Sequence, residues 1–265
     1  MIDLDPITGR LRLREPNSGD CLILYGSHAR GDFNAASDID VLRVGHARAL
    51  RENIDEAITL HTYTLDDLLL MARQGSLFVL HLLREGSPLN DPGGVMQALN
   101  AAFCQPDSFL QATRHRLRYA IRLLDIDEAL FATAPHEFLA TASFVCRSLL
   151  YATHAERGAF SFSLRGLALR DETAALLLAT KQTKVTYAGF RRLRQAARSY
   201  LGAEDDEILV SSVSDLAALG HRDGVFEGLM RRILTRLGAD PYDVASSAPM
   251  RPLPPEPAQS FHDGV

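Results

Sequence analysis

Two aspartates stand one residue apart in the stretch SDIDV, at positions 38 and 40, beside apolar residues. In a β-strand successive side chains alternate between faces, so Asp38 and Asp40 project to one side while Ile39 and Val41 face a core. The two Cα atoms would lie roughly 6.5–7 Å apart, and two carboxylates at that spacing repel each other unless a cation lies between them. Mg²⁺ prefers oxygen ligands and is usually held by one or two carboxylates together with substrate phosphates. The pair therefore predicts a magnesium site.

The residues before this pair have the chemistry of a phosphate-binding loop. Gly26 ends an apolar run and allows the backbone to approach a ligand closely. Ser27 opens a short helical turn whose free N–H groups favour phosphate, and Arg30 can add a charge-assisted contact to the phosphate chain. Ser37 can cap or orient the loop directly before Asp38. A strand, a phosphate loop and a second strand with two carboxylates together predict a nucleoside-triphosphate site.

The complete stretch GSHARGDFNAASDIDVL resembles the signature of the polymerase-β nucleotidyltransferase superfamily, written roughly as G-S-x-A-R-G, a short spacer and S-D-h-D-h. The matching residues are Gly26, Ser27, Ala29, Arg30, Gly31, Ser37, Asp38, Ile39, Asp40 and Val41. The resemblance implies a small mixed sheet with helices on one face. It also implies transfer of a nucleoside monophosphate from an NTP to a hydroxyl or similar acceptor, with release of pyrophosphate. In that reaction Asp38 and Asp40 would hold Mg²⁺, and Gly26 and Ser27 would cradle the β- and γ-phosphates.

Many members of that superfamily carry a third carboxylate on the next strand, where it completes the metal site and activates the attacking hydroxyl. The corresponding stretch here, AITLHTYT at residues 57–64, contains no Asp or Glu, and alignment puts His61 at that position. Three interpretations stay open. His61 could act as a general base, since its unperturbed pKa is about 6.5. The base could instead come from a second domain, or the protein could be a catalytically impaired, nucleotide-binding regulator of an antitoxin-like kind.

Local patterns predict the elements that position these residues. We expect strands over 22–25, 38–44 and 58–63, from their apolar and β-branched content. We expect helices over 27–31 (one turn), 47–57, 65–73 and 76–84, with Thr64 as the N-cap of the third. The stretch EGSPLNDPGG, residues 85–94, is full of turn residues and predicts the end of this unit.

After residue 104 the strand signals fade and apolar residues recur at three- and four-residue spacing. We expect helices over 106–125, 136–157, 172–179, 187–201 and 225–237. The predicted fold class is α+β. A small mixed β-sheet nucleotidyltransferase domain (1–103) would precede an all-α helical bundle that binds the acceptor (104–245) and a Pro-rich, disordered tail (246–265).

Composition sets the remaining bounds. The chain has 265 residues, 46% hydrophobic and 23% charged, with a net charge of −5, as in a soluble globular protein. A negative chain has no general attraction to nucleic acid or anionic membrane, so any polyanion site must be local. Three widely spaced cysteines favour reduced thiols, and no apolar run reaches membrane-spanning length. We therefore expect a cytoplasmic protein without a membrane partner; its oligomeric state stays open.

The helical half leaves the acceptor open between a small molecule, such as an aminoglycoside, and tRNA or protein. Residues 144–163 resemble a stretch in the helical domain of aminoglycoside nucleotidyltransferases, with Cys146, Arg147, Tyr151 and Gly158 in place. The lysine that often follows the glycine in those enzymes is missing. Arg147 also lies seven residues before His154, a spacing that resembles the signature of HEPN ribonucleases.

Basic and acidic segments suggest two further hypotheses about what the helical half binds. Residues 181–198 concentrate Lys and Arg, and could form a solvated helix face, contact the NTP phosphates from a second domain, or bind an RNA acceptor. Tyr187 and Phe190 could stack on a base there. The acidic segments 125–128 and 203–207 would instead suit a cationic acceptor if they lined the site.

Overall fold

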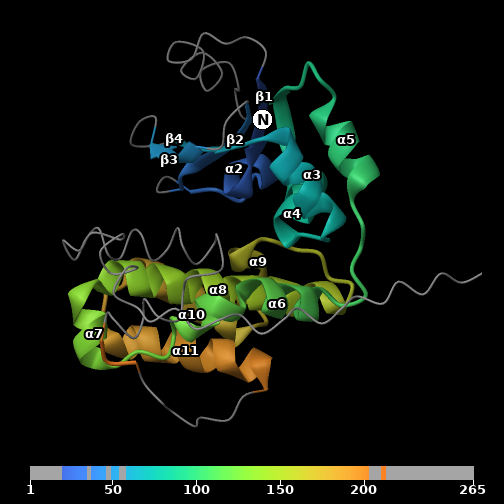
Figure 1. The fold of residues 1–265 in the computed structure, drawn as a ribbon. Coiled ribbons are helices and arrows are strands. Elements are labelled where there is room, and N and C mark those ends of the chain that lie inside the picture. The colour runs from blue at the N-terminus through green and yellow to red at the C-terminus, as the bar shows by residue number, and fades with distance from the viewer. Residues whose placement is uncertain (1–19, 35–36, 46–48, 54–57, 203–209, 213–265) are drawn as a thin grey trace, which may run out of the picture.

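The computed structural model describes residues 20–34, 37–45, 49–53, 58–202 and 210–212, and in them a mixed sheet with its helices is followed by a helical half (Figure 1). The strands are β1 (Cys21–Tyr25), β2 (Ile39–Val44), β3 (Ala49–Asn53), β4 (Ile58–Tyr63) and β5 (Ser87–Asn90). Their order in the sheet is β3-β4-β2-β1-β5. β2 and β4 run parallel, and every other neighbouring pair is antiparallel. The α+β fold class expected from the sequence is confirmed.

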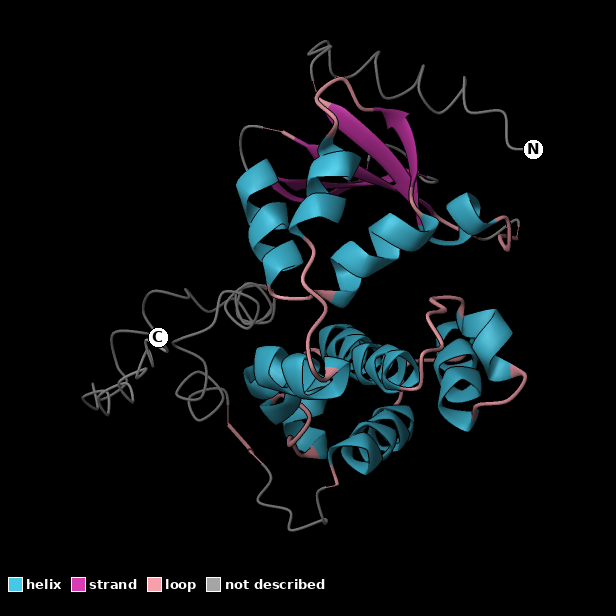
Figure 2. Cartoon of the chain, turned by 90° about the vertical axis from the view of Figure 1, so that its right-hand side faces the viewer, coloured by secondary structure: helices cyan, strands magenta, loops and turns pink. Residues whose placement is uncertain are grey.

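Among its described residues this first half contains the helices α2 (Gly26–Arg30), α3 (Leu65–Arg73), α4 (Leu77–Glu85) and α5 (Val95–Ala102). The predicted N-cap of α3 is confirmed, since the Thr64 hydroxyl accepts a hydrogen bond from the Asp67 N–H at 3.1 Å. Helices α3, α4 and α5 pack on one face of the sheet, whereas Ala29 of α2 packs against the apolar cluster of the other face. In Figure 2 helices lie between the sheet and the helical half.

Strand alternation gives the sheet two apolar faces. Ile23 and Leu42 lie on the face that packs against α3, α4 and α5. Val41 and Leu60 lie on the opposite face, and both are buried. Asp40 shares its face with Leu42, because the two residues are two positions apart on β2. The carboxylate is therefore placed where the helix-covered face ends and α2 leaves β1.

Two local predictions are wrong. The helix expected over 47–57 is contradicted, since residues 49–53 form β3 and pair with β4. The turn-rich stretch 85–94 contains β5, which pairs with β1 at the edge of the sheet and carries Pro88 there. An edge strand tolerates proline because one side of its backbone needs no ladder partner.

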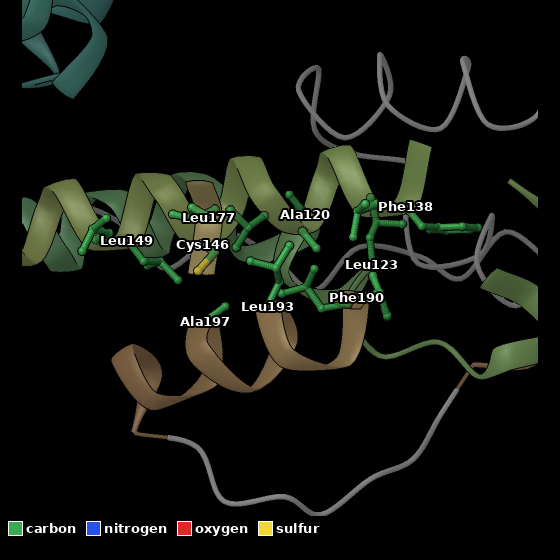
Figure 3. Close-up of a cluster of buried hydrophobic side chains, with 14 of the residues drawn as sticks. Ala120, Leu123, Phe138, Cys146, Leu149, Leu177, Phe190, Leu193 and Ala197 are labelled. Carbon is green, nitrogen blue, oxygen red and sulfur yellow. The ribbon is translucent and has the colours of Figure 1, made fainter. Parts of the chain in front are cut away.

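The helical half consists of α6 (Phe109–Arg122), α7 (Glu128–Thr133), α8 (Pro135–Glu156), α9 (Leu164–Ala168), α10 (Glu172–Gln182) and α11 (Tyr187–Leu201). Its core packs around α8 and includes Phe138, Cys146 and Leu193 (Figure 3). The helices expected over 106–125, 136–157, 172–179 and 187–201 are confirmed, whereas α7 and α9 were not predicted. The helix expected over 225–237, the acidic segment 203–207 and the Pro-rich tail lie outside the described residues.

The thiols match the expectation of unpaired cysteines. All three are free, with Cys21 and Cys146 buried and Cys104 exposed. Burial raises the pKa of both buried thiols to about 12, so they remain protonated. No helix among the described residues has the length and apolar character needed to cross a membrane.

Candidate active site

Gly26 and Asp40 are brought together at the end of β1. Tyr25, the last residue of β1, pairs with Asp40 of β2, and the chain then turns directly into α2. Gly26 has a φ of +76°, a conformation that favours glycine. A Cβ placed on Gly26 would lie 2.9 Å from the Oδ2 of Asp40. The missing side chain therefore opens the space in which the Asp40 carboxylate lies.

The two aspartates differ in exposure. Asp40 is half-buried beside Gly26, whereas Asp38 directly precedes β2 and is exposed. Ile39 between them is buried, which confirms the alternation predicted for this strand. Among the described residues no group of three or more His, Cys, Asp or Glu side chains is gathered as a metal site. A metal held by the pair would take its further ligands from phosphate oxygens and water, as Mg²⁺ commonly does.

The loop between α2 and β2 is fixed by its own polar residues. The Ser37 hydroxyl donates to Asn34 Oδ1 and accepts from the Asn34 N–H, both at 2.9 Å. The Ser37 carbonyl oxygen lies 3.2 Å from Nε2 of His28, whose ring stacks on Phe33 with centroids 4.4 Å apart. Ser37 thus orders the chain that leads into Asp38, as the sequence predicted, while its role toward a nucleotide stays a prediction.

Arg30 is held by carboxylates. Its Nη1 donates to Glu85 Oε2 at 2.9 Å, and its Nε donates to Asp32 Oδ1 at 3.2 Å. His81 Nε2 lies 3.1 Å from the same Glu85 oxygen. Burial works against the charge on Glu85, but the hydrogen bonds from His81 and Arg30 outweigh it, so the pKa of this carboxyl lies below its usual value. These contacts make Arg30 a residue that positions α2. They account for the arginine at this position without the predicted contact with phosphate, which stays a prediction.

The register of β4 places Thr59, and not His61, directly opposite Asp40. Asp40 pairs with Thr59, and Leu42 pairs with His61. Thr59 therefore stands directly beside Asp40, and it is buried. His61 lies on the same face two residues further along β4, where its ring meets the edge of Tyr25 with centroids 6.2 Å apart. Sequence alignment alone did not reveal this offset.

The model of the nucleotidyltransferase domain family matches residues 9–70, which contain Gly26, Ser27, Asp38 and Asp40. This chain carries a nucleotidyltransferase domain. The match agrees with the predicted resemblance to the polymerase-β superfamily, and it ends within α3. No curated protein matches the chain.

The helical half contacts the sheet-containing half close to the loop that follows α2. Ser163 donates to a carboxylate oxygen of Asp32, and Arg165 donates to the Asp32 carbonyl oxygen at 2.8 Å. The Phe162 N–H donates to Glu85 Oε1 at 3.2 Å, and its ring stacks on His81 with centroids 4.5 Å apart. The segment before α9 is thus bonded to both carboxylates that hold Arg30.

Tyr151 fixes that segment from within the helical half. Its hydroxyl donates to the Phe162 carbonyl oxygen at 2.8 Å, and the two rings meet edge to face. Burial raises the pKa of Tyr151 to about 12, so the hydroxyl keeps the proton that it donates. Of the residues that resemble aminoglycoside nucleotidyltransferases, Tyr151 therefore has a clear structural role.

Lys181, in the last turn of α10, lies within electrostatic range of the aspartate pair. Its side chain is exposed at the surface, yet partial desolvation and then the charge of Arg147 lower the pKa of Lys181. Asp40 and Asp38 act in the opposite direction.

Other polar residues singled out in the helical half have packing roles. His154 Nε2 lies 3.1 Å from Asp171 Oδ2, and Asp171 also caps α10. Phe190 is buried in the helical core, and the Tyr187 hydroxyl donates to the Ile126 carbonyl oxygen. Stacking of Phe190 on a base is contradicted by its burial, whereas the same role for the half-buried Tyr187 stays a prediction. The acidic segment 125–128 is likewise used internally, since Asp125 pairs with Arg198 and Asp127 caps α7.

Proposed function

We propose that this protein transfers a nucleoside monophosphate from a Mg²⁺-bound nucleoside triphosphate to a hydroxyl of an acceptor and releases pyrophosphate. The observation that carries the proposal is the approach of the Asp40 carboxylate to Gly26, which joins the metal-binding acid to the phosphate loop. The match to the nucleotidyltransferase domain family over 9–70 supports the same reaction class.

The residues divide the chemistry between them. Asp38 and Asp40 would hold Mg²⁺, which when bound stabilises the charge on the phosphates. The backbone at Gly26 and Ser27 would bind the β- and γ-phosphates, since only a residue without a side chain fits beside Asp40. The acceptor oxygen attacks the α-phosphorus, the bond from that phosphorus to the oxygen bridging to the β-phosphate breaks, and pyrophosphate leaves. The hydroxyl proton passes to a base, for which His61 is the candidate on the face of Asp40.

A transfer assay with Asp40→Asn tests the proposal. The protein is incubated with α-labelled NTPs, Mg²⁺ and a panel of acceptors comprising aminoglycosides, tRNA and proteins, and labelled product and pyrophosphate are measured. We expect both to fall by at least a hundredfold in Asp40→Asn, because one metal-binding charge is lost at the reacting phosphate. Asp66→Asn, which removes an exposed carboxylate at the start of α3, is the matched control and should retain activity.

The second candidate is a nucleotide-binding regulator. It is favoured by the absence of a carboxylate from β4, where Thr59 stands beside Asp40. Tight, Asp40-dependent binding of NTP without turnover across the whole acceptor panel would select this candidate over the enzyme. Turnover that survives Asp40→Asn would contradict both.

A further inference from the structure

Helix α2 is too short to fix its own place. It comprises five residues, Gly26–Arg30, and Tyr25 at its N-cap makes no side-chain hydrogen bond to the first turn. The first turn of a helix is unfavourable in isolation, because roughly six dihedral angles are fixed for one hydrogen bond. The position of Gly26 beside Asp40 therefore depends on what holds α2 against the rest of the chain.

Arg30, the last residue of α2, is bonded to a carboxylate of another element. Its Nη1 donates to Oε2 of Glu85 on α4 at 2.9 Å, and the two side chains are 17% and 14% exposed. The bond from Arg30 to Asp32 joins residues two apart in the chain, whereas the bond to Glu85 joins α2 to α4. In a largely buried pair, removal of one partner leaves the other charge poorly compensated, so the pair resists separation.

The carboxylate of Glu85 is itself held at both oxygens. His81 Nε2, one turn earlier on α4, lies 3.1 Å from the Oε2 that accepts from Arg30. The Phe162 N–H of the helical half donates to Oε1 at 3.2 Å, and the Phe162 ring stacks on His81. A planar carboxylate bonded at both oxygens keeps one orientation, so Glu85 presents a fixed acceptor to Arg30.

A carboxylate repels the phosphates of a nucleotide, so Glu85 is not a phosphate ligand. Any effect of Glu85 on nucleotide binding must pass through the residues that it holds. Glu85 also lies outside residues 9–70, over which the family model matches, and 55 residues after Arg30. The motif therefore contains the arginine but not the partner that fixes it.

We propose that Glu85 is a positioning residue for the phosphate loop, which it holds in place through Arg30 and α2. The inference rests on the proposed function, in which the backbone at Gly26 and Ser27 binds the β- and γ-phosphates. Phosphate affinity then depends on a residue that touches no phosphate. Because Oε1 of Glu85 accepts a hydrogen bond from Phe162, the helical half takes part in holding the same loop.

Titration calorimetry with Mg²⁺–pyrophosphate, Mg²⁺–ATP and AMP tests the inference. Glu85→Gln removes the charge and one acceptor oxygen but retains the length of the side chain. We expect its Kd for pyrophosphate and for ATP to rise roughly tenfold, while the Kd for AMP, which lacks the β- and γ-phosphates, stays within about twofold. Unchanged values for pyrophosphate and ATP overturn the inference.

A double-mutant cycle with Arg30→Gln identifies the route of the effect. Since Glu85 acts through Arg30, adding Glu85→Gln to Arg30→Gln should change the Kd for pyrophosphate by no more than about twofold. Additive losses in the double variant would mean that the two residues act independently, and they would overturn the inference.

Thr64→Ala is the matched control, because it removes the N-cap of α3 and destabilises the same half of the chain without touching α2. Its Kd values should match those of the wild type, which distinguishes positioning from a general loss of stability. Equal weakening in Thr64→Ala and Glu85→Gln would contradict a positioning role. Glu85→Asp, which keeps the charge but is one methylene shorter, replaces Glu85→Gln if that variant does not fold; it should weaken pyrophosphate binding too, and an unchanged Kd refutes the inference.

These titrations need no turnover, so they separate the inference from the proposed function. Weaker pyrophosphate binding in Glu85→Gln, together with no transfer by the wild type to any acceptor, would defeat the proposed transfer reaction and support the role of Glu85. Transfer by the wild type, together with unchanged Kd values in Glu85→Gln, would defeat the inference alone.

Discussion

Replacing Gly26 by alanine separates the backbone role of this glycine from its steric role at Asp40. Gly26 and Gly31, at the two ends of α2, have φ values of +76° and +79°. An alanine at either position would reduce the free energy of unfolding by a similar amount, about 1–2 kcal/mol, because of its backbone conformation. Only at Gly26 does the new Cβ meet Asp40 Oδ2 at 2.9 Å, whereas nothing lies within 4 Å of a Cβ at Gly31.

The two variants should lose similar stability and very different activity. The Asp40 carboxylate is the end of a short side chain, so it can relieve the contact by moving roughly half an ångström, at little cost in folding free energy. That movement displaces the carboxylate that we propose holds Mg²⁺, and misplacements of this order reduce turnover by about 10²-fold. Gly31→Ala should retain turnover within about threefold. Urea unfolding and the transfer assay measure the two quantities, and equal losses of turnover in both variants would refute a steric role for Gly26.

Two further predictions concern His61 and Glu85. If His61 is the general base, His61→Ala should lower turnover by about 10²–10⁴-fold and leave the Kd for Mg²⁺–NTP within about twofold, as measured by single-turnover kinetics and calorimetry; undiminished turnover removes the assignment. Glu85→Gln should cost about 2 kcal/mol of unfolding free energy at neutral pH, since Arg30 and the Phe162 N–H lose a charged acceptor. Because the pKa of Glu85 is lowered from 4.5 in the folded protein, its contribution is present above pH 4.5 and is lost as the pH falls through the lower folded value. Urea titrations should therefore show the variant approaching the wild type below pH 4.5, and a constant difference would contradict the role of the charge.

The sequence was sufficient where local chemistry determines the structure. The alternation around Ile39, the helical turn after Gly26 and the cap at Thr64 each depend on a few neighbouring residues, and all three are found as expected. The family motif is likewise contiguous, so its residues could be aligned without knowledge of the fold.

The sequence was insufficient where the structure of a segment depends on a partner that is distant along the chain. Residues 49–53 have no clear strand alternation and become β3 because β4 offers a free edge to pair with. The relative register of β2 and β4 depends on packing across the whole sheet, so neither strand's composition could show that Thr59, rather than His61, stands beside Asp40. Arg30 matched the motif, but its partner Glu85 lies 55 residues away.

The contacts of Arg30 bear on how the loop after α2 is held against the helical half. Arg30 is the only arginine of the motif, and its guanidinium is already bonded to Asp32 and Glu85, so its charge is largely offset within the protein. Both of these carboxylates also accept hydrogen bonds from the segment before α9. The two carboxylates that hold Arg30 thus fasten the loop after α2 to the helical half. The same fastening holds Arg165 beside the loop, since its guanidinium donates to the Asp32 carbonyl oxygen.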